Sequence, residues 1–202
     1  MLWYIFFYSL FGFAGPPIWS YNVPSSSMAD TLIVGDVFLA DRYAYAANPP
    51  QRGDVAIFEV DHTTYVKRVI GLPGDKIQLI DSVLYINGKA VERVPDGFYI
   101  TKDAFRDETK LQRYRETLPE GVSHDTLQLD PNGFGNNTPL YEVPPDHLFM
   151  MGDNRDNSVD SRHKQIGYVA REQLVGRATM LLFSFSAETG GWHGDRFLQP
   201  ID

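Results

Sequence analysis

Short hydrophobic runs, rich in β-branched and aromatic residues, alternate with Gly-Asp and Asn-Gly pairs along much of the chain. They lie at residues 31–45, 52–60, 63–80, 82–94, 147–154 and 176–185. Runs of this length bounded by turn residues are typical of β-strands. Asn87-Gly88, between two apolar runs, also indicates a tight hairpin. The pattern therefore predicts a β-rich protein.

The residues at 96–146 interrupt this pattern. They are more polar, and their hydrophobic positions follow neither the strand period nor the helix period. We interpret them as a loop-rich subdomain inserted into a β core, which is built from residues 20–95 and 147–187. Residues 188–202 would then form a C-terminal tail.

The N-terminal segment is the most hydrophobic part of the chain, and residues 1–29 contain no Asp, Glu, Lys or Arg. We predict a membrane anchor over residues 1–19, although a helix over residues 2–19 spans only about 27 Å of a roughly 30 Å hydrocarbon core. Pro16 and Pro17 also disfavour a helix that continues past them. A core-buried or interfacial segment and a cleaved signal peptide remain alternatives, but the signal peptide lacks a basic start and a cleavage motif.

Length and composition narrow the range of functions. A chain of 202 residues can bury a real core within one domain. Its net charge of −8 argues against a nucleic-acid partner, because such proteins concentrate Lys and Arg on one face. The chain has no cysteine, which excludes disulfides, thiolate nucleophiles and cysteine zinc sites.

Several short motifs are better explained without a special function. The acidic stretch 152–160 lacks the glycine and the final glutamate of a calcium loop, whether counted from Asp153 or from Asp156. The five histidines show no metal-ligand spacing and suggest no Ser-His-Asp triad. We expect neither a metal nor another cofactor.

Ser25, Ser26 and Ser27 form a run of hydroxyls just after the apolar N-terminus, and Lys67 lies within a predicted strand. Taken locally, the serines suit a solvated turn and Lys67 suits a salt-bridged or snorkelling strand lysine. A lysine buried among apolar neighbours, however, can lose its proton near neutral pH and then accept one from a serine hydroxyl. Such a Ser-Lys pair needs no histidine.

Successive motifs resemble the conserved boxes of type I signal peptidase, the bacterial leader peptidase. In order, they are PSSSMADTL (24–32), RGDVAIF (52–58), YVKRVIGLPGD (65–75), GDNRDNSVDSR (152–162) and GRA (176–178). The resemblance implies an all-β fold: a folded-over antiparallel sheet forms the catalytic core, with an inserted β-rich subdomain and an N-terminal membrane anchor. It hardly extends to residues 96–146.

Matched position by position, the resemblance implies a role for each serine and for the lysine. Ser27 would be the nucleophile and Lys67 its general base. Ser25, with the backbone N–H of Ser27, would form the oxyanion hole, and Ser158 would hydrogen-bond the lysine amine and orient it. Ser26 stands at a position where the family has a small residue.

Further matched positions concern the substrate and the support of the site. The resemblance implies that cleavage follows small residues in an Ala-x-Ala pattern. Asp160 and Arg162 would form a supporting charge pair, whereas Asp30 departs from the family, which has proline there, and adds a carboxylate near the nucleophile. The positions matching the substrate pockets are Val23, Met28, Leu32, Tyr65 and Val66.

The expected partners are exported pre-proteins that carry signal peptides, and membrane lipid. The protein would be anchored in the cytoplasmic (inner) membrane with its catalytic domain on the periplasmic side. Two alternatives stay open. One is a related Ser-Lys protease, such as a conjugation-specific pilin peptidase or a self-cleaving repressor, and the other is a non-catalytic membrane-anchored β scaffold.

Overall fold

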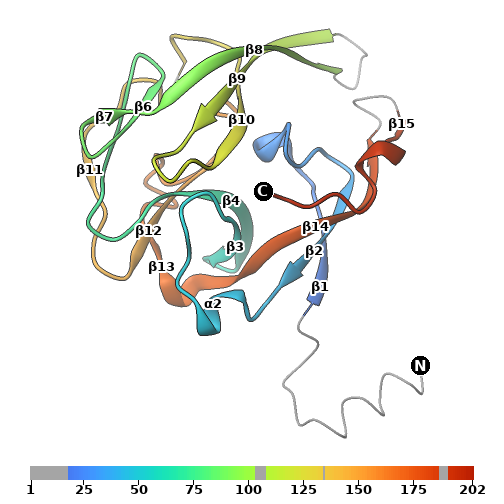
Figure 1. Ribbon diagram of the computed structural model, residues 1–202, viewed down its shortest axis with the longest axis horizontal. Helices are drawn as coiled ribbons and strands as arrows, with labels where there is room; N and C mark the ends of the chain where they lie inside the picture. Colours follow the sequence, from blue (N-terminus) through green and yellow to red (C-terminus); the bar gives the residue numbers. More distant parts are fainter. Residues whose placement is uncertain (1–17, 103–107, 134, 187–190) are drawn as a thin grey trace, which may run out of the picture.

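The computed structural model describes residues 18–102, 108–133, 135–186 and 191–202, and strands dominate them (Figure 1). The predicted all-β class is confirmed, with antiparallel pairing between the strands. The strands are β1 (Ile18–Asn22), β2 (Asp36–Asp41), β3 (Val55–Val60), β4 (Thr63–Gly71), β5 (Lys76–Ile80), β6 (Val83–Ile86), β7 (Lys89–Ala90), β8 (Glu92–Lys102), β9 (Glu108–Thr117), β10 (Ser123–Gln128), β11 (Tyr141–Glu142), β12 (His147–Met151), β13 (Val169–Ala170), β14 (Leu174–Ser186) and β15 (Gly191–Trp192).

The large sheet has the order β1-β2-β14-β3-β4-β12-β13, with β15 attached to β14. The order places β14, from near the C-terminus, between β2 and β3, so the two ends of the chain contribute to one sheet. Two short helical segments lie between strands of this sheet, α2 (Ala44–Ala47) and η2 (Arg171–Gln173), and a third, η3 (Gly194–Arg196), follows β15. Strand β4 lies inside the sheet, so its second half, from Lys67 onward, is buried on both faces.

Two smaller sheets complete the fold. One has the order β10-β9-β8 and lies at the top of Figure 1, and the other has the order β11-β5-β6-β7 and lies at the left. The prediction that residues 96–146 are loop-rich is wrong in this respect, because most of β8, all of β9 and β10, and β11 fall within them. The polar sequence is misleading because most side chains of β9 are exposed or half-buried, and β10 buries polar side chains, among them His124 and Gln128, so neither strand shows a clean alternation of apolar and polar residues. The division of the chain into domains stays a prediction.

Hydrophobic clusters fill the space between and beside the sheets. One joins the large sheet to the four-stranded sheet and includes Ile70, Leu79 and Phe149. Another lies under the N-terminal strands and includes Phe38 and Ile57. These clusters fix β4 and the segment after β1, which are the parts of the chain that carry the predicted catalytic residues.

The hairpin predicted at Asn87-Gly88 is confirmed. Both residues have positive φ, 54° and 77°, and they join the antiparallel strands β6 and β7. Glycine tolerates this conformation without strain, and asparagine tolerates it better than most residues. Asp61-His62 and Asp81-Ser82 also have positive φ and join β3 to β4 and β5 to β6.

Most of the predicted membrane anchor, residues 1–17, lies outside the described residues. Ile18 and Trp19, its last two residues, belong to β1 and pair with β2 across the sheet, so the anchor boundary at residue 19 is placed too late. Pro16 and Pro17 come directly before this strand, in keeping with their poor fit to a helix. Within the described part of the chain, we find no helix with the length and apolar character needed to cross a bilayer.

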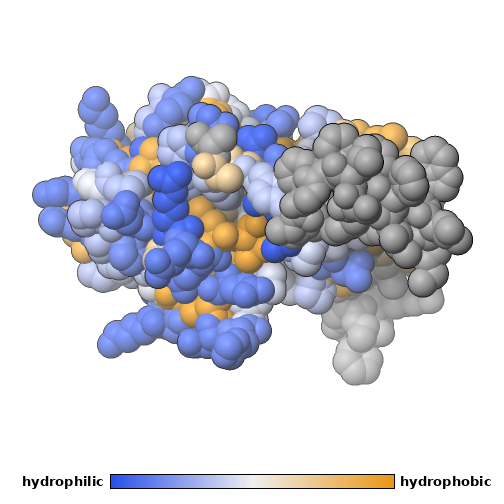
Figure 2. Space-filling view, turned by 90° about the horizontal axis from the view of Figure 1, so that it is seen from below, coloured by the Kyte–Doolittle hydropathy of each residue, from blue (hydrophilic) through white to orange (hydrophobic). Residues whose placement is uncertain are grey.

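One face of the protein is largely polar, with hydrophobic groups between the charged ones. Figure 2 shows this for the face at the lower edge of Figure 1, where orange hydrophobic residues lie between blue hydrophilic ones. Exposed aromatic side chains also gather where β14, β15 and η3 meet. Phe183 lies 6.2 Å from Trp192 and 6.0 Å from Phe197 between ring centroids, and all three are about half exposed.

Candidate active site

The three serines at 25–27 lie in a short turn that the hydrophobic core holds on both sides. Strand β1 ends at Asn22, and Ser26–Met28 form one turn of 3-10 helix, η1. Val23, before the turn, and Met28, within it, are buried in the same cluster. Because buried side chains hold the turn, its hydroxyls are presented in fixed positions at the surface of the large sheet.

Lys67 of β4 points its amine at this turn. Its Nζ lies 2.7 Å from the Oγ of Ser27 and donates a hydrogen bond to the carbonyl oxygen of Val66 at 2.9 Å. Strand β4 places the side chain there through its pairing with β3, in which Lys67 lies opposite Ala56. With one N–H directed to the carbonyl, the amine is oriented toward the serine hydroxyl, so the two predicted catalytic residues are in direct contact.

Burial controls the charge of this amine. Lys67 is only 4% exposed, and this desolvation lowers its pKa from 10.5 to about 8. The carboxylates of Asp160 and Asp153 act in the opposite direction and raise the pKa, while the Arg162 guanidinium lowers it. Desolvation outweighs the carboxylates, so the amine exchanges its proton close to physiological pH.

Asp30, which departs from the resembled family, lies three residues after Ser27 in the sequence and pairs with a residue of another strand. Its carboxylate is 3.3 Å from Nη1 of Arg113 on β9, and burial raises its pKa. The charges that shift the pKa of Lys67 are those of Asp160, Asp153 and Arg162.

Ser25 and Ser26 have different surroundings from Ser27. The Ser25 Oγ lies 3.3 Å from the Oγ of Ser27, so both hydroxyls face one point. The Oγ of Ser26 instead accepts a hydrogen bond of 2.8 Å from Nδ2 of Asn157. The contacts thus separate the triplet into two hydroxyls near the amine of Lys67 and one that faces the loop after β12.

Ser158 lies in that loop, and the structure does not form its expected hydrogen bond with Lys67. Its hydroxyl is buried, makes no hydrogen bond of ordinary geometry within the described residues, and lies near enough to Asp160 to lower the pKa of that carboxyl. Gly152 separates it from the nucleophile turn. A Cβ added at Gly152 would contact the Ser158 hydroxyl and come within 2.5 Å of the carbonyl oxygen of Ser27.

Asp160 and Arg162 form the expected charge pair. The guanidinium donates to the carboxylate through Nε at 2.9 Å and Nη2 at 2.8 Å, and both side chains are buried. The carboxylate also accepts the backbone N–H of Gly152 at 3.0 Å. Burial alone raises the pKa of Asp160, but Arg162 and these hydrogen bonds bring it below its usual value. The pair therefore holds the 152–162 loop next to Lys67.

A cleft of about 220 Å³ opens beside Ser27 and Lys67. It lies between two segments of extended chain, the end of β1 with the residues after it and the middle of β4. All five residues predicted to line the substrate pockets do line this cleft: Val23, Met28, Leu32, Tyr65 and Val66. Its walls are mostly apolar, and the serine hydroxyls and the amine supply polar groups at its edge.

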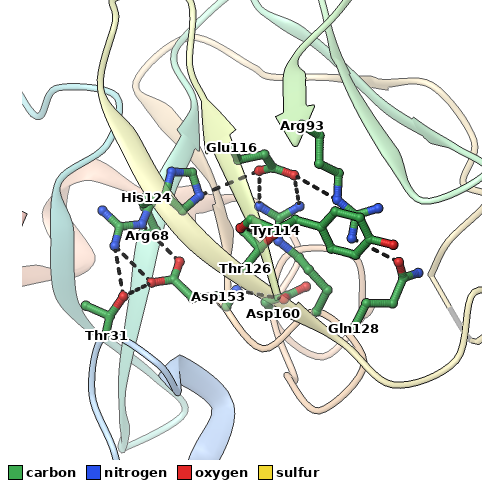
Figure 3. Close-up of polar contacts among 12 residues, drawn as sticks. Thr31, Arg68, Arg93, Tyr114, Glu116, His124, Thr126, Gln128, Asp153 and Asp160 are labelled. Carbon is green, nitrogen blue, oxygen red and sulfur yellow. Dashed lines mark hydrogen bonds and ion pairs between the residues drawn. The ribbon is translucent and has the colours of Figure 1, made fainter. Parts of the chain in front are cut away.

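A second buried ion pair begins at the residue that follows Lys67 on β4. Arg68, the residue after Lys67, donates to Asp153 through Nε and Nη2, each at 2.9 Å, and both side chains are fully buried. The same carboxylate accepts a hydrogen bond of 2.6 Å from the hydroxyl of Thr31, which lies four residues after Ser27 (Figure 3). Strand β4, the nucleophile segment and the loop after β12 are therefore joined at one carboxylate.

A cluster around Glu116 of β9 continues this polar interior into the three-stranded sheet (Figure 3). Its carboxylate accepts hydrogen bonds from both terminal nitrogens of Arg155 and lies 4.0 Å from Nε of Arg93. His124 lies 3.6 Å from Glu116, and burial lowers the pKa of this histidine to about 3, so it is uncharged. Arg155 therefore connects the 152–162 loop to the three-stranded sheet.

Asn154 connects the same loop to the backbone of the nucleophile turn. Its N–H donates to the carbonyl oxygen of Ser27 and its Nδ2 to that of Ser26, each at 3.1 Å. On the other side of the loop, the backbone of Leu127 in β10 bonds to Asp153 and Arg155 at 2.9 Å and 3.0 Å. The turn is thus held in place by a loop that is itself held by another sheet.

The sequence alone did not assign roles to Gly152, Asn154, Arg68, Asp153 or Glu116. The first four lie inside the motifs that carry the resemblance, so the motifs pointed to the region but not to the contacts. Glu116 lies in a polar stretch without a motif. A buried carboxylate cannot be told from an exposed one by sequence when its partner is 39 residues away.

We predict that Asp153→Asn destabilises the fold strongly. The substitution leaves the buried Arg68 guanidinium without its counterion, and breaking such a pair costs about 3 to 5 kcal/mol. Urea unfolding followed by circular dichroism measures the free energy of unfolding.

Glu142→Gln is the matched control. It makes the same chemical change in an exposed pair with Lys76, 3.3 Å apart, which is worth at most about 1 kcal/mol. Equal losses of stability in the two variants would contradict the role given to the Arg68–Asp153 pair.

Comparison with known proteins identifies the family of the chain. The family model described as signal peptidase, peptidase S26, matches residues 2–183. The chain is 36% identical over 194 residues to signal peptidase I of Rickettsia bellii, covering 82% of this chain and 65% of that protein. It is also 36% identical over 193 residues to signal peptidase I of Rickettsia typhi, covering 81% of this chain and 71% of that protein.

Among solved structures, a signal peptidase I from Enterococcus faecalis is similar, with 28% identity, a TM-score of 0.38 and coverage of 64% of this chain and 97% of that one. The chain spans just under two thirds of the length of the Rickettsia bellii relative. The family match, in contrast, extends over nearly the whole chain and includes both residues of the Ser-Lys contact. The chain belongs to the signal peptidase family, peptidase S26.

Proposed function

We propose that this protein is a membrane-bound serine endopeptidase that removes signal peptides from exported pre-proteins. The observation that carries the proposal is the 2.7 Å contact between Nζ of Lys67 and Oγ of Ser27 at the edge of an apolar cleft. A lysine with a pKa of about 8 can serve as a general base, which an ordinary surface lysine cannot do near neutral pH.

The chemistry follows from this contact. Ser27 Oγ attacks the scissile carbonyl carbon while its proton passes to neutral Lys67. The C–N bond then breaks, and Lys67 returns the proton to the leaving amine, which leaves the acyl group as an ester on Ser27. A water molecule then attacks the ester carbonyl carbon and gives a proton to Lys67. The bond between the acyl carbon and Ser27 Oγ breaks, the acyl group leaves as a carboxylic acid, and Lys67 returns the proton to Ser27 Oγ.

Ser25 and the backbone N–H of Ser27 are the proposed donors to the oxyanion. The position of the Ser25 hydroxyl, 3.3 Å from the attacking oxygen, supports this role. Such a donor contributes about 3 to 4 kcal/mol to stabilising the transition state. The 152–162 loop positions the dyad, with Asp160 paired to Arg162 and Ser158 beside them.

The proposed substrate has small residues at P1 and P3, the Ala-x-Ala pattern. An extended peptide fits between the two segments that bound the cleft, and its alternate side chains point to the same face. Met28 and Leu32 are fully buried at the base of the cleft, so there is little depth for a large side chain.

The proposed location is the outer face of the cytoplasmic membrane, with residues 1–17 as the anchor. The aromatic group of Phe183, Trp192 and Phe197 supports contact with lipid, because Trp is enriched at membrane interfaces and the exposed Phe rings add apolar surface. Phe183 lies opposite Val37 of β2, and Val37 lies opposite Asn22 at the end of β1. The aromatic group therefore lies at the same end of the sheet as the cleft.

We predict that a pre-protein with Ala at P1 is cleaved and that the same pre-protein with Phe at P1 is not. A shallow apolar cleft cannot enclose the larger side chain, so we expect a loss of kcat/KM of at least roughly 100-fold. Gel analysis in detergent, with sequencing of the product N-terminus, measures both rate and site. Comparable cleavage of the two pre-proteins would contradict the signal-peptidase assignment.

The same assay separates the alternatives. A protease dedicated to one pilin substrate would leave unrelated Ala-x-Ala pre-proteins uncut, and a self-cleaving repressor would cut its own chain. A non-catalytic scaffold would cut nothing. Cleavage of several unrelated pre-proteins at the predicted bond is the result expected for a signal peptidase.

A further inference from the structure

A second cavity, of about 270 Å³, lies behind the nucleophile turn. The turn contributes Ser26 and Ala29 to its wall, strands β8 and β9 contribute Tyr99 and Leu111, and the loop after β12 contributes Asn154. The cleft described above is instead lined by Ser25, Ser27 and Met28 of the same turn. The turn therefore separates the cleft from the second cavity, and different residues of the turn line each of them.

The wall of the second cavity on the sheet side is apolar and well packed. Leu111 and Ala29 are buried together with Leu127 in one cluster, and Tyr99 packs against it. Tyr99 and Leu111 lie directly opposite each other on β8 and β9. Thr101, one of the other lining residues, follows Tyr99 on the same face of β8. An uncharged side chain would find apolar contacts here.

The opposite edge of the cavity is polar and reaches the nucleophile turn. Asn157, which lines it, donates to the Ser26 hydroxyl at 2.8 Å. Asn154 and Asp156 also line it, and each has a buried Oδ1 with no hydrogen-bond partner within the described residues. These residues offer acceptors and one negative charge, which suit the N–H groups and the new amino terminus of a cleaved peptide.

We propose that the second cavity binds the first residues of the mature protein, those that follow the scissile bond. This inference rests on the proposed function and extends it to the leaving side of the substrate. With the acyl side in the cleft and the scissile carbonyl at Ser27, the peptide continues past the turn at about 3.3 Å per residue. The peptide then reaches the second cavity, which lies on the other side of the same turn as the cleft. The Ser26 hydroxyl in the wall of this cavity is hydrogen-bonded to Asn157 of the 152–162 loop.

The lining defines what the cavity accepts. Leu111 and Tyr99 favour an apolar side chain at one of the first two mature positions. The Asp156 carboxylate favours the positive charge that develops on the leaving amine and disfavours an acidic residue there. The second cavity thus adds a specificity for the mature sequence to the specificity for small residues on the signal-peptide side.

The test uses the full chain in detergent and pre-proteins that share one Ala-x-Ala signal peptide. The first two mature residues are both Ala in one substrate and both Leu in the other. Wild type is expected to cleave the Leu substrate with a kcat/KM about tenfold higher than that for the Ala substrate. Tenfold is the lower limit of the effect that even one methylene group has in an apolar pocket. Thr101→Phe fills the cavity and is expected to reduce the ratio of the two kcat/KM values from about ten to about one.

Ile100→Phe is the control, because it adds the same ring to the neighbouring position of β8, where the side chain is 52% exposed and outside the cavity. It should retain the tenfold preference. If Thr101→Phe discriminates as wild type does, or if wild type cleaves both substrates equally, the cavity assignment is overturned and the proposed function stands. A wild-type chain that cleaves neither substrate overturns both.

Discussion

Ser27→Ala is expected to reduce cleavage to background, a loss of roughly 10⁴-fold or more, while the protein remains folded. The substitution removes the attacking oxygen, which lies 2.7 Å from Nζ of Lys67, and almost no volume. Ser27 is only partly buried, so its loss leaves no cavity in the core. A cleavage time course on an Ala-x-Ala pre-protein, with circular dichroism of the variant, measures both effects.

The neighbouring serines provide the matched controls. Ser25→Ala should lose about 10² to 10³-fold, because the backbone donor of the oxyanion hole remains. Ser26→Ala should lose less, since its hydroxyl contacts Asn157 and lies away from Lys67. A Ser26→Ala variant less active than both others, or a Ser25→Ala variant as inactive as Ser27→Ala, would contradict the roles assigned within the triplet.

Lys67→Arg is expected to be as inactive as Ser27→Ala. It keeps the positive charge and most of the stem, so a purely structural salt bridge or a snorkelling role would survive. A guanidinium stays protonated, however, because its pKa exceeds about 12. The variant should therefore show background cleavage from pH 6 to pH 10, although circular dichroism should show it folded.

Substantial cleavage by folded Lys67→Arg would contradict the general-base role and leave Lys67 as a structural strand lysine. Ser158→Ala tests whether Ser158 orients the Lys67 amine, separately from the role of that amine as a base. If Ser158 positions Lys67, this variant should lose part of its rate and keep a rising pH profile. Lys67→Arg, in contrast, should have no rising limb at all.

Much of the fold was predictable because strand signals are local. The apolar runs bounded by Gly-Asp and the Asn87-Gly88 pair identify β2 to β7 and their hairpin. The strands within 96–146 do not show in the sequence because β9 carries mostly exposed or half-buried charged side chains and β10 buries polar ones. Asp61-His62 and Asp81-Ser82 also form two-residue turns with positive φ, but those residue pairs carry a weaker turn signal than Asn-Gly.

The candidate site was predictable to the extent that motifs carry it. The cleft-lining residues and the Ser27–Lys67 contact lie where the motifs placed them. The sequence could not supply the supports, because Glu116 and Arg155, or Asn154 and Ser26, are joined by folding over long separations. The second cavity depends on β8 and β9, most of which lie in the polar stretch 96–146 where no strand pattern is visible, so it cannot be predicted from the sequence.

The dependence of wild-type cleavage on pH tests the central claim most directly. If neutral Lys67 takes the proton from Ser27, kcat/KM should rise roughly tenfold per pH unit below about pH 8 and level off above it, following the pKa of the buried amine. The new N-terminus should begin directly after the P1 alanine throughout this range. A rate that is flat from pH 6 to pH 10, or that falls as the amine deprotonates, would contradict catalysis by a Ser27–Lys67 dyad.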